Sequence, residues 1–132
     1  MKINRLLAAF VQQSACPCSL AAAALLLSPT SAACAEVCFA SQYGVGDGYH
    51  GRRTASGERF NTYAADPYTV AHRKLPFGSM VTITNLLNGR SIAAKVNDRG
   101  PFTHRRCVDL GRAGADAIGM AGTARVRIDS SD

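Results

Sequence analysis

The 132-residue sequence contains no tryptophan and no apolar run long enough to cross a bilayer. Its longest uninterrupted apolar run, from Leu20 to Leu27, falls far short of the ~20 residues that a membrane-spanning helix needs. The chain is also short for two domains of ordinary size. The sequence therefore predicts no integral membrane span, and it favours one small domain.

Residues that usually hold metals or nucleotides are sparse. The three histidines, His50, His72 and His104, lie too far apart for a local metal motif, and no paired-cysteine zinc spacing occurs after residue 35. The glycine string from Gly44 to Gly48 leads into Tyr49 and not into an apolar helix, so a dinucleotide-binding loop is not predicted. We expect no metal and no cofactor.

The chain has few acidic residues, with 9 Asp and Glu against 15 Lys and Arg and a formal net charge of +6. The arginines are scattered and no nucleic-acid-binding motif accompanies them, so nucleic acid is not an expected partner. A basic surface is instead attracted to acidic polymers of a cell envelope, and salt weakens that attraction.

The first 35 residues are compositionally distinct from the remainder. Lys2 and Arg5 are their only charges, apolar stretches follow, and small residues close the segment between Ser31 and Ala35. This order is typical of a secretion signal. We therefore expect export to the periplasm or cell envelope, with secretion as an alternative, after cleavage near residues 33–35. Residues 36–132 then form the domain.

Export makes the cysteines informative, because thiols can pair in an oxidising compartment. Cys38 and Cys107 are the disulfide candidate, and their bridge would close a loop of about 70 residues, worth about 4 kcal/mol in the chain-entropy model. Cys34 stands beside the expected cleavage site, where a lipoprotein carries its lipid. A lipid anchor there is disfavoured because Ser31 occupies the position at which that signal has a large aliphatic residue.

The sequence of this domain predicts mostly β-structure. Period-two patterning over 80–85 and 91–96, around Asn88-Gly89, predicts a hairpin. Further strand candidates are 37–43, 107–110 and 124–128, and the one convincing helix runs from about Arg112 to Ile118 and ends at Gly119. Residues 44–67 are loop-like. Several short strands with long connections favour a closed barrel that carries its site on loops.

Three carboxylates stand in contexts that suit chemistry on a glycosidic bond, which needs an acid near the leaving oxygen and commonly a second carboxylate. Glu58 lies in a loop of small residues, and Asp98 lies where a strand ends before Pro101. Asp109 alternates between two apolar residues and is expected to be enclosed. The alternative for each is a turn cap or a surface ion pair. Asp47 is expected to be solvated.

Six segments resemble the rare lipoprotein A (RlpA) family. They are Thr54–Phe60, Ala71–Gly78, Val81–Leu86, Asn88–Arg90, Asn97–Phe102 and Val108–Leu110. The resemblance implies a six-stranded double-psi β-barrel with one or two short helices, related to those of expansins. It also implies lytic transglycosylase activity on peptidoglycan glycan strands that lack peptide stems. The family's catalytic pair corresponds to Glu58 and Asp98, with His72 in support, and Asp109 is a third candidate.

Such enzymes cleave without water. An acid protonates the oxygen that bridges N-acetylmuramic acid and N-acetylglucosamine, and the muramic 6-hydroxyl then attacks its own C1 to give a 1,6-anhydro end. We assign the acid/base role to Asp98 and stabilisation of positive charge at C1 to Glu58, with the reverse order left open. A raised pKa would suit the acid.

Four neighbours of the catalytic candidates are assigned to substrate binding or packing. Arg99 stands next to Asp98. Tyr43, Tyr49 and Phe102 are candidate sugar-stacking platforms, and core packing is the favoured role of Phe102. The expected partner is a peptidoglycan glycan strand, and the expected state is a monomer. The rival function is a non-catalytic, expansin-like module that binds glycan and loosens the wall.

Overall fold

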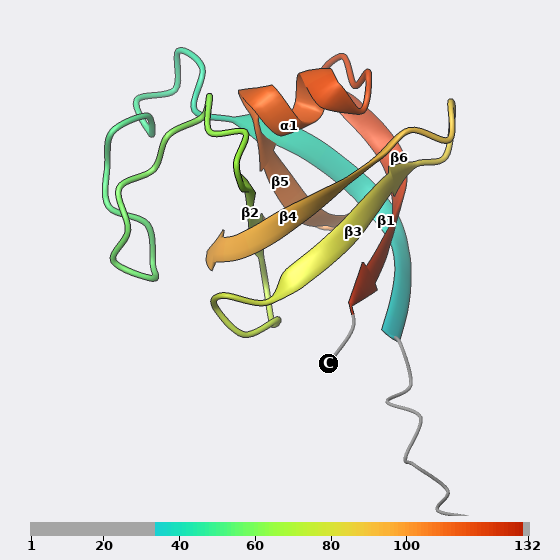
Figure 1. The fold of residues 1–132 in the computed structure, drawn as a ribbon, viewed down its shortest axis with the longest axis horizontal. Helices are drawn as coiled ribbons and strands as arrows, with labels where there is room; N and C mark the ends of the chain where they lie inside the picture. Colours follow the sequence, from blue (N-terminus) through green and yellow to red (C-terminus); the bar gives the residue numbers. More distant parts are fainter. Residues whose placement is uncertain (1–33, 131–132) are drawn as a thin grey trace, which may run out of the picture. The chain divides into compact units, whose positions relative to one another are not determined.

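A computed structural model describes residues 34–130 of the chain, and six strands of this part form a closed barrel (Figure 1). In chain order the elements are β1 (Cys34–Tyr43), β2 (Tyr68–His72), β3 (Met80–Asn85), β4 (Ser91–Asp98), β5 (Arg106–Gly111), α1 (Arg112–Ala117) and β6 (Thr123–Ser130). Around the barrel the strands are ordered β1-β5-β2-β4-β3-β6. The predicted mostly-β, six-stranded barrel is therefore confirmed, with one short helix in the described residues.

The predicted hairpin is the antiparallel pair of β3 and β4, in which Ile83 faces Ile92. Gly89 in its turn has φ of +75°, a conformation that glycine adopts without a steric penalty. Val81 and Ile83 of β3 are buried, and so are alternate residues of β4. This is the arrangement that the period-two apolar pattern predicts. The hairpin forms because its period-two apolar pattern buries one face.

The barrel closes through two parallel pairs, β1 with β5 and β2 with β4. The sequence did not single out β2 as a strand, because most of Tyr68–His72 is buried on both faces and shows no alternation. In the pairing of β2 with β4, Val70 faces Val96 and Ala71 faces Asp98. Asn97 is thus an extra residue in the register, a bulge that redirects the end of β4.

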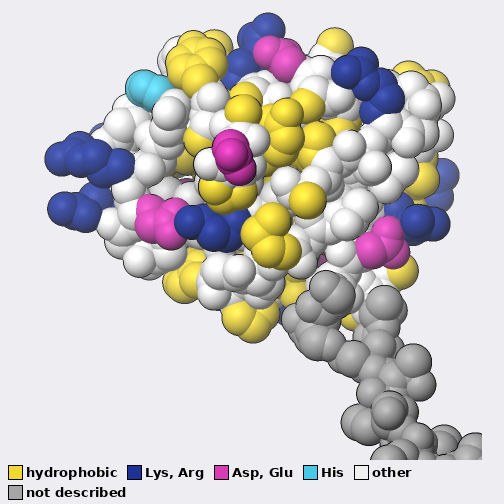
Figure 2. Space-filling model, in the orientation of Figure 1, with side chains coloured by type: hydrophobic (Ala, Val, Ile, Leu, Met, Phe, Trp, Pro, Cys, Tyr) yellow, Lys and Arg dark blue, Asp and Glu magenta, His cyan; other side chains and the backbone are white. Residues whose placement is uncertain are grey.

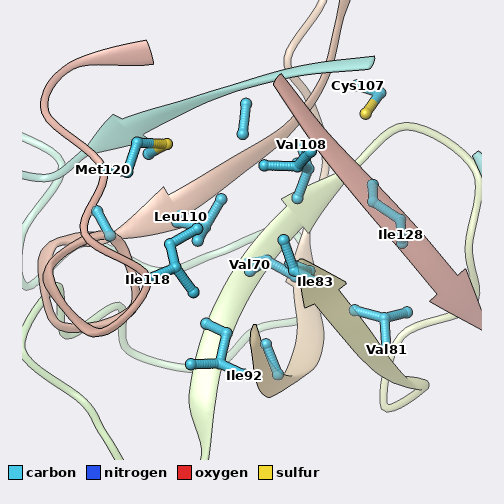
Figure 3. Packing of buried hydrophobic residues seen from close by; sticks show 14 of the residues in the cluster. Val70, Val81, Ile83, Ile92, Cys107, Val108, Leu110, Ile118, Met120 and Ile128 are labelled. Atoms are coloured by element: carbon cyan, nitrogen blue, oxygen red, sulfur yellow. The ribbon is translucent and has the colours of Figure 1, made fainter. Parts of the chain in front are cut away.

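Aliphatic side chains from all six strands fill the barrel, and Figure 3 shows them converging between the ribbons. Val70, Val108 and Leu110 are fully buried at its centre. Ile118 and Met120, which follow α1, add to the same cluster at one end. Burial of each such side chain contributes about 1.5–3 kcal/mol, so this cluster holds the barrel as a rigid base for its loops.

Helix α1 is short and begins and ends where the sequence predicts to within one residue. Ile118 is its C-terminal cap, and Gly119 follows with φ of +65°. The Ile118 carbonyl accepts hydrogen bonds from the side-chain amides of Asn85 and Asn88, at 2.9 and 3.0 Å. These bonds satisfy a helix-end carbonyl and tie α1 to the β3–β4 hairpin. Neither α1 nor any other part of residues 34–130 forms a helix that could span a membrane.

Thr62 fixes the long loop between β1 and β2 to the barrel. Its hydroxyl donates to the Tyr43 carbonyl and accepts from the Arg112 N–H, both at 2.7 Å. Its own carbonyl accepts from the N–H of Ala113 at 2.9 Å. Thr62 is fully buried, so these bonds satisfy polar groups that would otherwise be costly to enclose. The second half of the loop is therefore anchored to the end of β1 and to the start of α1.

A disulfide joins Cys38 on β1 to Cys107 on β5. Cys34 is an exposed free cysteine. The expected signal segment and its cleavage near residues 33–35 fall almost entirely outside the described residues and stay predictions.

Candidate functional site

A cavity of about 340 Å³ lies at the end of β4, and we call it the Asp98 cavity. Five of the residues assigned from the sequence line it: Tyr43, Tyr49, Asp98, Arg99 and Asp109. They come from β1, β4, β5 and two loops, so the barrel topology gathers residues that are up to 66 positions apart. Glu58 and His72 are not among its lining residues.

Asp98 is held in this cavity by one oxygen. Its Oδ1 accepts hydrogen bonds from the backbone N–H of Ala55 at 2.9 Å and of Arg99 at 2.8 Å. Its Oδ2 has a single, longer contact, with the Tyr43 hydroxyl at 3.4 Å. The two oxygens therefore differ, since one anchors the side chain and the other is available to a ligand.

Tyr43 donates to Asp98 from a rigid position. Its ring is stacked on Phe60, with centroids 4.2 Å apart and planes at 16°. Burial, and then the negative charge of Asp98, raise the pKa of Tyr43 well above its usual range, so the phenol keeps its proton. One face of the Tyr43 ring is thus covered by Phe60, and its hydroxyl is directed to Asp98.

Glu58 lies beside the Asp98 cavity in the loop that docks on β4. Its Oε1 accepts from Lys95 Nζ at 2.8 Å, and its Oε2 accepts from Asn97 Nδ2 at 3.1 Å. These two hydrogen bonds, Lys95 first, lower the pKa of Glu58. The side chain is 45% exposed. Glu58 is thus an ionised, partly solvated carboxylate fixed to the residue that precedes Asp98.

Asp109 is the second assigned carboxylate inside the cavity. Its Oδ1 accepts from the Ser41 hydroxyl and from Arg106 Nη2, the latter at 2.7 Å. Ala71 on β2 pairs with Asp98 on one side and with Asp109 on the other. Since neighbouring strands are ~4.8 Å apart, the two aspartates stand about two strand spacings apart across Ala71.

The His72 ring lies away from the Asp98 cavity. Its Nδ1 accepts from the backbone N–H groups of Lys74 and Leu75, both at 3.1 Å, and its Nε2 lies 3.2 Å from Glu36 Oε2. The His72 carbonyl accepts from Arg99 Nη1 at 3.3 Å. The structure thus places the ring in the turn after β2 and links His72 to the cavity through its backbone.

Arg99 and Phe102 occupy positions that the sequence did not reveal. The Arg99 guanidinium lies over the Phe77 ring, 3.7 Å from its centroid. Phe102 is 83% exposed at the cavity rim. The expected core-packing role of Phe102 is therefore wrong, because the chain turns outward after Gly100 and Pro101.

Asp47 and Arg106 line the cavity without having been assigned to it. Asp47 accepts from the N–H groups of Gly44 at 2.6 Å and Tyr49 at 3.0 Å, so it shapes the turn that presents Tyr49. The signal for Asp47 was its place in the glycine string, where a short acidic side chain caps turns. No local signal in the sequence marked Arg106.

Comparison with solved structures identifies the class of fold as the double-psi β-barrel. The expansin of Clavibacter michiganensis matches with a TM-score of 0.57 and 18% identity, over 75% of this chain and 51% of that one. A Streptomyces papain inhibitor matches with a TM-score of 0.56 and 19% identity, over 75% and 96% of the two chains. At these identities the likeness concerns the fold alone.

The family model described as lytic transglycolase matches residues 37–128, and the chain belongs to this family. A probable endolytic peptidoglycan transglycosylase RlpA of Nostoc is 54% identical over 92 residues, which are 68% of this chain and 24% of that protein. Endolytic peptidoglycan transglycosylases RlpA of Pseudomonas aeruginosa and Campylobacter jejuni are 46% and 40% identical over 70% and 76% of this chain.

The chain spans about a quarter to a third of the length of these relatives, namely 24% of the Nostoc protein, 26% of the Pseudomonas protein and 36% of the Campylobacter protein. The resemblance to the RlpA family that the six sequence segments indicated is confirmed.

Proposed function

We propose that this protein is a lytic transglycosylase that cleaves the bond between N-acetylmuramic acid and N-acetylglucosamine in stem-free glycan strands and leaves 1,6-anhydro ends. Membership of the lytic transglycolase family and the names of the relatives support this activity. The observation that carries the proposal is Asp98, a carboxylate anchored through one oxygen at a cavity lined by aromatic side chains.

Asp98 acts as the general acid and then as the base. Because Oδ1 already accepts two backbone hydrogen bonds, the proton resides on Oδ2, which is the oxygen available to the bridging oxygen of the glycan. After the bridging oxygen is protonated and its bond to C1 breaks, the muramic 6-hydroxyl oxygen bonds to C1. The same Oδ2 of Asp98 accepts the proton that this hydroxyl loses. Such a positioned acid/base contributes typically 10²–10⁴-fold to a rate.

Glu58 stabilises the positive charge that develops at C1, because its hydrogen bonds to Lys95 and Asn97 keep it ionised. Asp109, which lines the cavity opposite Asp98, binds substrate hydroxyls together with its partner Arg106. Tyr49 and Phe102, both exposed at the rim, supply sugar-stacking surfaces. Arg99 and His72 hold the end of β4 in place through the bond between them.

The proposed setting is the periplasm or cell envelope, where peptidoglycan is found, and the proposed acting form is a monomer. The composition of the first 35 residues supports export. The basic balance of the chain supports attraction to an acidic wall polymer. In Figure 2 the Lys and Arg side chains are dispersed over the face in view, with acidic groups between them.

The test is digestion of stem-free peptidoglycan by wild type, Glu58→Gln and Asp98→Asn, with products identified by mass spectrometry. Anhydro-muramyl ends from wild type and their loss in Asp98→Asn support the enzyme. Binding without new ends by all three proteins would instead identify an expansin-like, non-catalytic module.

A further inference from the structure

A second cavity, of about 580 Å³, lies beside the disulfide and is larger than the Asp98 cavity. Three arginines line it, Arg73, Arg105 and Arg125, and we call it the arginine cavity. The Arg73 guanidinium donates a hydrogen bond to the Arg106 carbonyl. Val37 and Phe39 of β1 form its apolar wall, and both are nearly half exposed, at 49% and 44%. Apolar area of this kind left open beside fixed charges is typical of a binding surface.

The backbone holds these groups in register. Phe39 pairs with Arg125 across β1 and β6, so the two side chains share one face of the sheet. The Phe39 N–H donates to the Arg105 carbonyl at 3.1 Å, and the disulfide ties β1 to β5 beneath them. The cavity is therefore built on rigid strands and not on loop side chains alone.

Arg105 adopts φ of +69°, the one positive value at a non-glycine residue in the described part of the chain. A long side chain in this conformation is strained, and such strain concentrates at functional sites. Within residues 34–130, Arg73, Arg105 and Arg125 form no ion pair. Glu36 is the acidic residue of the cavity, and it faces His72.

These charges define what the cavity can accept. Three arginines and one glutamate give 3 − 1 = +2 around an apolar wall. Guanidinium groups match carboxylates in a planar, two-pronged geometry, and the Val37–Phe39 wall suits methyl and methylene groups. A ligand that carries several carboxylates on a short, partly apolar body therefore fits. A membrane fits poorly, because the apolar side chains line a hollow and do not protrude.

We propose that the arginine cavity binds the carboxylates of a peptidoglycan peptide stem, and so holds the enzyme on the wall while the Asp98 cavity processes a stem-free strand. This inference rests on the proposed function, since that function sets peptidoglycan as the polymer at hand. The two cavities are separate, because no residue lines both of them.

The experiment measures binding of the stem tripeptide L-alanyl-γ-D-glutamyl-diaminopimelic acid by calorimetry and by amide chemical shifts. Wild type is expected to bind this peptide, with changes in the amide chemical shifts of Val37 and Phe39. It is expected to bind the fully amidated form of the peptide much more weakly. Arg105→Gln and Arg125→Gln are each expected to weaken binding about tenfold, as the loss of a charged hydrogen bond predicts. Arg90→Gln, an exposed change outside the cavity, is the matched control.

Equal weakening by Arg90→Gln, equal binding of the amidated peptide, or no binding at all would overturn the proposal. Binding to anionic phospholipid vesicles in place of the peptide would also overturn it and would indicate a membrane surface. The Asp98→Asn variant separates the proposed catalytic function from the proposed peptide site, because it is expected to lose cleavage and to keep peptide binding. Wild type that binds the peptide but makes no anhydro ends would refute the proposed function and leave this site standing.

Discussion

The backbone N–H of Ala55 donates a 2.9 Å hydrogen bond to Asp98 Oδ1, and this bond ties the Glu58 loop to the end of β4. A second bond, from Ser56 N–H to the Asn97 carbonyl at 3.2 Å, reinforces it. Two acidic motifs that are 40 residues apart in the chain are thereby brought side by side. Asp98 faces the cavity, whereas Glu58 lies on its flank.

Tyr43→Phe keeps the stack on Phe60 and removes the hydroxyl that contacts Asp98 Oδ2. We expect a roughly three- to tenfold lower rate, the value of one ordinary hydrogen bond, because this contact is long, at 3.4 Å. The measurement is the initial rate of release of anhydro-muramyl ends, with the free energy of unfolding measured beside it. An unchanged rate would contradict a role for the Tyr43 hydroxyl in positioning Asp98.

The ion pair of Glu58 with Lys95 makes stability depend on pH. Since the pKa of Glu58 is lowered in the folded protein, the contribution is complete above the ordinary carboxyl pKa and is lost as the pH falls through the lowered value. Lys95→Gln should raise the pKa of Glu58 toward its ordinary value and flatten this part of the stability curve. Side-chain carboxyl titration by NMR and urea denaturation from pH 3 to 7 measure both effects. An unchanged titration in Lys95→Gln would remove Lys95 as the cause.

Gly44→Ala tests the packing beneath Tyr43. A Cβ there would overlap the Phe60 ring and lie 2.7 Å from the Thr62 Cβ, and φ is +88°. The expected cost is roughly 2–5 kcal/mol, from the left-handed conformation and from overpacking together. Gly46→Ala is the matched control, because its φ is +71° but open space surrounds it, and it should cost about 1–2 kcal/mol. Equal losses of denaturation free energy would show that the Phe60 contact is unimportant.

Replacing both Cys38 and Cys107 with serine should lower the free energy of unfolding by about 4 kcal/mol, because the bridge spans a sequence separation of 69 residues. Cys34→Ser serves as the control and should leave the unfolding midpoint unchanged, since Cys34 is exposed and free. Guanidinium denaturation under non-reducing conditions measures all three proteins. A double variant as stable as wild type would show that the bridge adds nothing to the barrel.

The sequence predicted best those structural features that depend on residues close together in the chain. The β3–β4 hairpin follows from alternation around Asn88-Gly89, and Asp98 from its place at a strand end before Pro101. The direction of a side chain at a bulge is set by register with another strand, which no local pattern records. Asn97 therefore turns toward Glu58 and Asp98 toward the cavity. For the same reason the position of the His72 ring could not be predicted.

The central claim is that the Asp98 cavity breaks a glycosidic bond without water. Its most direct test is digestion of stem-free glycan strands in water enriched in heavy oxygen, followed by mass spectrometry of the new ends. We expect unlabelled 1,6-anhydro-muramyl ends from wild type and none from Asp98→Asn. New reducing ends that carry the heavy oxygen would contradict it, because they would show that water, and not the 6-hydroxyl, attacks C1.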